Sequence, residues 1–249
     1  MSSGASWPFL AQPVWKSLTR TFYGRLRLRN TLRGGQRKMR TASKSDQRFW
    51  DRLASKYARQ PISDQETYEK KLAITRKYLT PQSSVFEFGC GTGSTALLHA
   101  PHVDYILATD LAENMLDVGR VRAAEADIQN VDFQRIGIEE FDPAGHSFDV
   151  VLGLNILHLC RDPDAVTRKV RALLKPGGYF IQSTACLKDA SFILRLAIPV
   201  MQAVGKAPNV SFLSEDDILS MLDNNGFDLT ESLRTDSSMS ANFYVAQKR

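Results

Sequence analysis

The sequence predicts an α/β fold, with a doubly wound and mostly parallel sheet covered by helices on both faces. Three features predict it: a glycine-rich turn directly after a short apolar strand, a second strand that ends in an acidic residue, and alternating helical and extended segments after them. A chain of 249 residues that is 43% hydrophobic can bury one full core. We therefore expect one α/β domain with appendages.

The glycine-rich turn is the feature on which the functional prediction depends. Residues 85–88 alternate apolar side chains around Glu87, which suits a short buried strand, and three glycines follow: Gly89, Gly91 and Gly93. Glycine permits a positive φ and lets another molecule approach the backbone closely. A helix that begins near Ser94 would direct its first N–H groups at that molecule, which favours an anionic group.

The spacing of this turn counts against a dinucleotide. The dinucleotide fingerprint has the pattern G-x-G-x-x-G, whereas this turn has Ser94 at the sixth position. A second strand, residues 103–109, ends in Asp110, where a carboxylate can bind a ribose diol from the tip of the neighbouring strand. The turn and the carboxylate together are a much more specific signal of a ligand-binding site than either feature alone.

These residues resemble the motifs of the class I S-adenosylmethionine-dependent methyltransferases. The resemblance implies a Rossmann-like sheet of seven strands with the last one antiparallel, and S-adenosyl-L-methionine as methyl donor. It implies that Glu87 and the glycines line the methionine part, that Asp110 holds the ribose hydroxyls, and that Leu111 and Met115 flank the adenine. Cys90 is expected to be a small packing residue in the turn. The full set expected at the cofactor is Tyr57, Glu87, Gly89, Cys90, Gly91, Gly93, Asp110, Leu111, Met115, Gly137, Ile138, Glu139 and Asn155.

The resemblance covers residues 46–249. Residues 133–141 align with the loop after the family's third strand, where an Asp often receives the adenine amino group. This chain has Gly137 there, so that contact would pass to the Ile138 backbone or to Glu139. Residues 148–158 look like the fourth strand, residues 173–178 look like the turn before the fifth, and small bacterial methyltransferases share a run like residues 195–208.

The first 45 residues differ in composition from the rest. They hold ten Lys or Arg and no Asp or Glu, so the overall charge of +5 hides a remainder with a net charge of −5. An acidic domain does not indicate a nucleic-acid surface, which is normally a basic face. We predict that residues 1–45 are a basic, disordered extension, or come from a start codon upstream of Met39. A transit peptide and a membrane-surface helix are the alternatives, the latter through Trp15, Leu18, Phe22 and Leu26.

The cysteines favour a reducing compartment and no metal. Cys90, Cys160 and Cys186 have neither disulfide nor metal spacing. We expect the protein in the cytoplasm, or in mitochondria if the tail is a transit peptide.

The elements before the turn are two helices. Ser45 or Asp46 can cap a helix over residues 49–58, whose apolar face carries Phe49, Trp50, Leu53 and Tyr57. The resemblance identifies this segment as a cover helix, with Tyr57 against the cofactor or acceptor; the alternative is simple packing on the sheet edge. A second helix is predicted over residues 64–78.

Helices and strands alternate after the turn. Residues 112–126 predict a helix with Met115, Val118 and Val121 facing inward, and Asp162 with Pro163 predict the start of another that reaches Leu174. Ser214 and the acidic residues after it predict the last helix, which Gly226 ends. Residues 227–233 and 242–247 predict the two final strands.

An insertion, residues 187–213, precedes the last helix. Its apolar side chains would cover most of a helix circumference, which requires cover on nearly all sides: Phe192, Ile193, Leu196, Ala197, Ile198, Val200, Met201 and Val204. At this place the segment would lie over the carboxyl ends of the strands, where ligands bind. We predict a lid that supplies an apolar acceptor pocket; a dimer interface and a membrane contact are the alternatives.

Few residues are needed for methyl transfer itself. The methyl group of the implied cofactor is already activated, so placing the acceptor supplies much of the acceleration, up to about 7 to 11 kcal/mol. Only a hydroxyl acceptor demands removal of a proton. Asn155 and His158 follow the fourth strand and are the candidate catalytic residues, with His158 either a base or a packing residue. The other histidines, His99, His102 and His146, are expected to face solvent.

The sequence therefore predicts methyl transfer to a small, fairly apolar acceptor, such as a lipid, a quinone or a secondary metabolite. The alternatives are an RNA methyltransferase anchored by the basic tail, a non-catalytic S-adenosylmethionine-binding protein, and a nicotinamide oxidoreductase, against which the glycine spacing counts. We expect no nucleic-acid partner and either a monomer or a homodimer. A peripheral membrane contact through the basic tail or the apolar lid stays open.

Overall fold

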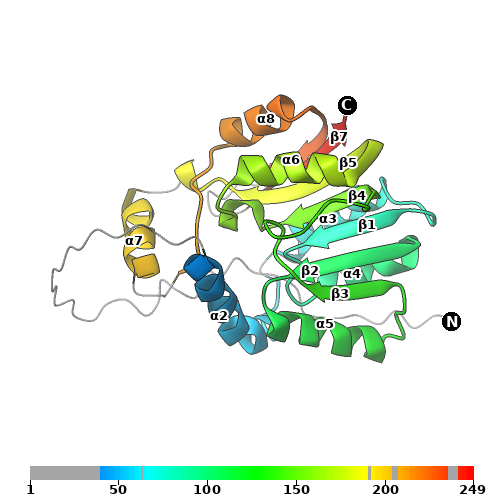
Figure 1. Cartoon of the computed structure of the whole chain (residues 1–249), viewed down its shortest axis with the longest axis horizontal. Coiled ribbons are helices and arrows are strands. Elements are labelled where there is room, and N and C mark those ends of the chain that lie inside the picture. Colours follow the sequence, from blue (N-terminus) through cyan, green and yellow to red (C-terminus); the bar gives the residue numbers. More distant parts are fainter. Residues whose placement is uncertain (1–39, 63, 190–191, 204–206, 235–240) are drawn as a thin grey trace.

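The computed structural model describes residues 40–62, 64–189, 192–203, 207–234 and 241–249 (Figure 1). The predictions for residues 1–39 lie outside this part of the chain. Seven strands form one sheet in the order β3-β2-β1-β4-β5-β7-β6. The strands are β1 (Ser84–Phe88), β2 (Tyr105–Asp110), β3 (Val131–Arg135), β4 (Phe148–Leu154), β5 (Leu174–Ala185), β6 (Phe227–Leu233) and β7 (Ala241–Lys248).

Among the described strands, β7 alone runs opposite to the other six. It pairs antiparallel with both β5 and β6, whereas the pairs that join β3, β2, β1, β4 and β5 are all parallel. The predicted seven-stranded sheet with an antiparallel last strand is therefore confirmed.

Helices cover both faces of the sheet. In Figure 1, α6 and α8 lie in front of the strands and α3 and α4 lie behind them, while α2 lies beyond the strand ends. The helices are α2 (Arg40–Tyr57), α3 (Gln65–Arg76), α4 (Ser94–His99), α5 (Glu113–Glu125), α6 (Pro163–Leu173), α7 (Phe192–Ala203) and α8 (Glu215–Asn224), with short 3-10 turns η2 (Ala100–His102), η3 (Leu157–Leu159) and η4 (Leu187–Asp189). No helix among the described residues has the length and apolar character needed to cross a bilayer.

The strand order reverses beside β1, because the chain moves from β1 outward to β2 and β3 and then returns to β4 on the other side. The loops that leave β1 and β4 therefore diverge, and a crevice opens between them at the carboxyl ends of the strands. Phe88, Asp110 and Leu154 end their strands at this edge.

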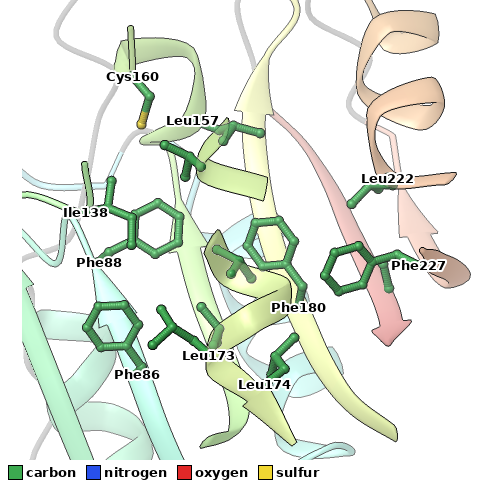
Figure 2. Close-up of a cluster of buried hydrophobic side chains, with 14 of the residues drawn as sticks. Phe86, Phe88, Ile138, Leu157, Cys160, Leu173, Leu174, Phe180, Leu222 and Phe227 are labelled. Carbon is green, nitrogen blue, oxygen red and sulfur yellow. The ribbon is translucent and has the colours of Figure 1, made fainter. Parts of the chain in front are cut away.

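The side chains of β1 point alternately to the two faces of the sheet, and each face packs in a separate hydrophobic cluster. Phe86 and Phe88 are fully buried in a cluster that includes residues of α6 and α8, and Figure 2 shows both rings among these side chains. Val85 belongs to the opposite cluster, with residues of α4 and α5. Successive strand side chains point to opposite faces, so Glu87 lies on the side of Val85.

Several local predictions were wrong. Helix α2 begins at Arg40, so neither Ser45 nor Asp46 caps it. Val121 on α5 is 56% exposed, because the buried face of that helix also uses the small residues Gly119 and Ala123. His99 is fully buried, whereas His102 and His146 are exposed as predicted.

The insertion packs mainly on the end of β5. Ile198 and Met201 of α7 form a small cluster with Ala185, Leu187 and Ala207. Val200 is 51% exposed. Among the described residues of the insertion, only Pro208 reaches a cavity at the strand ends.

Candidate functional site

Two adjoining cavities lie along the carboxyl edge of the strands. The first cavity runs from Asp110 and the loop 136–140 to Trp50, Leu159 and Pro208. The second cavity lies between α3 and the glycine-rich turn. Five residues line both cavities and so mark where they meet: Tyr57, Gly89, Gly91, Leu154 and Asn155.

The three glycines of the turn all have positive φ, at 64°, 55° and 69°. A Cβ at Gly89 would lie 2.4 Å from Cγ1 of Ile156, and one at Gly93 would lie 2.5 Å from Cε1 of Phe133. At Gly91 the nearest atom would be Cε1 of Tyr57, at 3.9 Å. Gly89 and Gly93 are thus required by the packing of the chain itself, and Gly91 faces open space between the cavities.

Asp110 joins the end of β2 to the turn. Its Oδ2 accepts a hydrogen bond from the Gly91 N–H and its Oδ1 accepts one from the Ala112 N–H, both at 2.9 Å. Burial raises the pKa of Asp110, although these backbone donors oppose the shift. The two sequence features that predicted the site therefore lie in direct contact.

Glu87 is an acid buried on the wall of the second cavity. Its side chain is 3% exposed, and its Oε2 has no hydrogen-bond partner among the described residues. Burial raises its pKa to about 8, and the nearby charge of Asp110 adds to the shift. A buried carboxyl oxygen without a donor costs free energy, so this position favours a cationic or donor group in the cavity.

The far end of the first cavity is formed by Leu111, Met115, Gly137, Ile138 and Glu139. A Cβ at Gly137 would lie 2.6 Å from Cδ2 of Leu111, so a side chain cannot replace Gly137 without moving Leu111. Glu139 Oε1 accepts a hydrogen bond from the Arg161 N–H at 2.7 Å. The Glu139 carboxylate therefore already has a hydrogen-bond donor in the segment that follows β4.

Helix α2 forms the roof of both cavities. Asp46 and Trp50 line the first cavity and Tyr57 lines both. Burial, together with the charge of Asp110, raises the pKa of Tyr57 to about 12, so its hydroxyl stays protonated.

Hydrogen bonds hold helix α2 in place at two positions. Asp46 Oδ1 accepts a hydrogen bond from the Asn209 N–H at 3.1 Å, and Asp51 Oδ1 accepts one from the Asn114 N–H on α5 at 3.1 Å. The helix is thereby fixed both to the insertion and to the main domain.

The two candidate catalytic residues differ in position. Asn155 lies at φ 57°, and its N–H donates to Ser183 O and Oγ while its Oδ1 accepts from that hydroxyl, so the side chain is fixed where the cavities meet. His158 lines neither cavity. It is 5% exposed, burial lowers its pKa to about 4, and its Nδ1 has no hydrogen-bond partner in the described part of the chain.

The predicted cofactor residues line one cavity or both, except Gly93, which packs against Phe133. Sequence reasoning missed several lining residues, because they come from segments without a motif: Asp46, Tyr68, Lys71, Arg161, Ser183 and Pro208. The described residues contain no cluster of three or more His, Cys, Asp or Glu suited to a metal ion.

Comparison with known proteins agrees with this geometry. Residues 86–180 match a family model described as a methyltransferase domain. The ubiquinone biosynthesis O-methyltransferase of Acinetobacter baumannii (strain AYE) is 31% identical over 114 residues, which are 45% of this chain and 48% of that protein. The chain thus spans about half the length of the curated relatives it matches.

Solved structures show the same fold at low identity. The YcgJ protein of Bacillus subtilis has a TM-score of 0.61 and 18% identity, covering 73% of this chain and 99% of that one. The N-methyltransferase NodS of Bradyrhizobium japonicum WM9, in complex with S-adenosyl-L-homocysteine, has a TM-score of 0.60 and 14% identity, covering 82% and 98%. The strand order and the glycine-rich turn therefore belong to a Rossmann-like methyltransferase fold, within which residues 86–180 match a methyltransferase domain.

Proposed function

We propose that the protein transfers the methyl group of S-adenosylmethionine to a small, fairly apolar acceptor. The observation that carries the proposal is the pair of cavities that meet at Gly89, Gly91 and Asn155, with an acid on the wall of each. One cavity suits a nucleoside and the other an amino-acid end, so the sulfonium between them would lie at the junction.

The residues present fit this cofactor. Glu87 offers a buried oxygen without a partner, which suits the ammonium of the methionine part. Asp110 reaches the first cavity from the end of β2 and suits the ribose hydroxyls. Leu111, Met115 and Ile138 give the far end of that cavity an apolar wall suited to adenine.

The chain's own contribution is to place the acceptor and to exclude water. The cofactor supplies an activated methyl group when bound, so no covalent step on the protein is required. Tyr57 and Asn155 border the junction, and the Ser183 hydroxyl fixes the Asn155 side chain. Helix α2 covers the junction and so excludes water. This favours in-line approach of the acceptor to the methyl group over hydrolysis of the cofactor.

The acceptor side of the first cavity favours an apolar molecule. Trp50, Leu154, Ile156, Leu159 and Pro208 line it. Asp46 lies on the same side, and burial raises its pKa, so it is a proton acceptor available for a hydroxyl. His158 is not part of the proposal, because it lines neither cavity.

The proposal is tested with radiolabelled S-adenosylmethionine and a fractionated cell extract. We expect label in the organic-solvent fraction, and we expect an Asp110→Asn variant to lose that labelling. Label confined to RNA or protein would contradict a small apolar acceptor. Wild-type protein that fails to bind S-adenosylhomocysteine in calorimetry would contradict the enzyme itself.

A further inference from the structure

Arg122 is a half-buried arginine of α5 that joins two other segments of the chain. Its Nη1 donates hydrogen bonds to Thr92 Oγ1 at 3.1 Å and to Ser94 Oγ at 2.9 Å, and its Nη2 donates one to the carbonyl oxygen of Ala58 at 2.9 Å. Thr92 and Ser94 line the second cavity at the end of the glycine-rich turn, and Ala58 is the residue that follows α2. One guanidinium therefore bridges the turn and the end of the roof helix.

The bridge is made only to neutral oxygens. No ion pair among the described residues includes Arg122, whereas Arg120, two residues earlier on α5, pairs with Glu113 and Asp117. Burial lowers the pKa of Arg122, and the charge of Glu125 only partly offsets the shift. The arginine is therefore partly removed from water to reach these oxygens, and its planar fork serves both segments at once.

Tyr57 is the last residue of α2 and borders both cavities. The described residues offer its hydroxyl no hydrogen bond, and its ring packs beside a small cluster formed by Ala54, Ala112 and Met115. Because the side chain has no polar anchor of its own, the place of the ring depends on where the backbone at the end of α2 is held. The bond from Arg122 to Ala58, the next residue, holds that backbone.

Taking the proposed function as its basis, we infer that Arg122 positions Tyr57 at the junction of the cavities by holding the end of α2 to the glycine-rich turn. Arg122 lines neither cavity, so it acts through Tyr57. The other two tethers of α2, at Asp51 and Asp46, are six and eleven residues away from Tyr57. At 1.5 Å per residue they lie about 9 and 16 Å along the helix, too far to fix its last turn.

A second arginine at the same helix end supplies a matched control. Arg59 is exposed, and its Nε donates a hydrogen bond to the carbonyl oxygen of Ser55 at 3.0 Å, within the last turn of α2. A cation in this place stabilises a helix through its dipole. Arg59 thus provides the charge at the helix end without a bond to another element, whereas Arg122 provides both.

The test is a double-mutant cycle on ligand affinity. Calorimetry gives the dissociation constant of S-adenosylhomocysteine for the wild type, Arg122→Met, Tyr57→Ala, the double variant and the control Arg59→Met. We expect Arg122→Met and Tyr57→Ala each to weaken binding about tenfold, as loss of a hydrogen bond from a charged donor does, and Arg59→Met to leave it unchanged. In the Tyr57→Ala background, Arg122→Met should have no further effect, because the two residues act as one unit.

Arg122→Lys is the second variant of the test, and it keeps the positive charge if Arg122→Met does not fold. A single ammonium cannot serve both the turn and Ala58, so Arg122→Lys should bind as weakly as Arg122→Met and show the same loss of effect with Tyr57→Ala. Wild-type affinity in Arg122→Lys would overturn the inference, because charge alone would then be sufficient.

Additive weakening by Arg122→Met and Tyr57→Ala would also overturn it, because the arginine would then act on general stability or on the turn. Each of these results leaves the proposed function intact. Wild-type protein that fails to bind S-adenosylhomocysteine would overturn the proposed function and this inference together.

Discussion

Replacing single glycines with alanine separates backbone strain from steric conflict in the glycine-rich turn. Gly89, Gly91 and Gly145 all have positive φ, at 64°, 55° and 79°. A Cβ at Gly145 would have no atom within 4 Å, so Gly145→Ala measures strain alone. An L-residue in the left-handed region costs about 1 to 2 kcal/mol, and we expect Gly145→Ala to lose about that much stability.

Gly89→Ala should lose considerably more. The new Cβ would lie 2.4 Å and 2.7 Å from Cγ1 and Cδ1 of Ile156, and 3.0 Å from its Cβ. Rotation of the isoleucine side chain cannot relieve the last contact, because the Cβ position is fixed by the backbone. Overpacking typically costs about 1 to 3 kcal/mol, which added to the strain gives about 2 to 5 kcal/mol.

Gly91→Ala should affect ligand binding more than stability. Its Cβ would face open space, with Tyr57 Cε1 at 3.9 Å, so its stability should match that of Gly145→Ala. The added methyl group would occupy the junction of the cavities, and we expect S-adenosylhomocysteine to bind at least about tenfold more weakly.

Urea unfolding of the three variants measures these differences as shifts of the midpoint at constant m-value. The double variant Gly89→Ala with Ile156→Ala should cost less than the sum of its single changes, because the alanine removes the two closest atoms. If Gly89→Ala unfolds at the same urea concentration as Gly145→Ala, the packing of Ile156 against the turn is wrong.

Three further predictions follow from single residues. Asp110→Asn should weaken S-adenosylmethionine binding by about 1.5 to 3 kcal/mol in calorimetry, and unaltered affinity in a folded variant would remove Asp110 from the site. Burial lowers the pKa of His99 to about 3, so the unfolded state binds a proton first and stability falls as the pH drops from about 6.5 towards 3. At pH 4.5 the resulting loss of stability is about 3 kcal/mol. His99→Leu should therefore flatten the slope of unfolding free energy against pH, and an unchanged slope would refute this role of His99. Ser214→Ala removes the N-cap of α8, where the Ser214 side chain accepts from the Asp217 N–H, and should cost about 0.5 to 2 kcal/mol in urea unfolding, with no effect counting against the cap.

The strands and the turn could be predicted because their signals are local. The alternation around Glu87 and the acid at position 110 depend only on neighbouring residues, and parallel strands bring their carboxyl ends to one edge. Ser214 and Gly226 likewise marked the ends of α8 through their own backbone preferences.

The errors arose where long-range packing decides. The buried face of α5 includes Gly119 and Ala123, which lie inward because they are small, whereas Val121 points outward. A pattern based on large apolar side chains therefore selects the wrong face. Lys71 had no sequence signal at all, because a lysine on a helix normally faces solvent and only the tertiary structure turns this one inward.

Helix α2 constrains the order in which the proposed enzyme would bind and release its reactants. Residues of α2 border both compartments, and the helix is tethered through Asp46 to the insertion and through Asp51 to α5. Displacing it to admit one reactant uncovers the other, so the two occupants cannot exchange independently. Turnover should therefore be sequential, with both reactants bound beneath α2 before the methyl group is transferred.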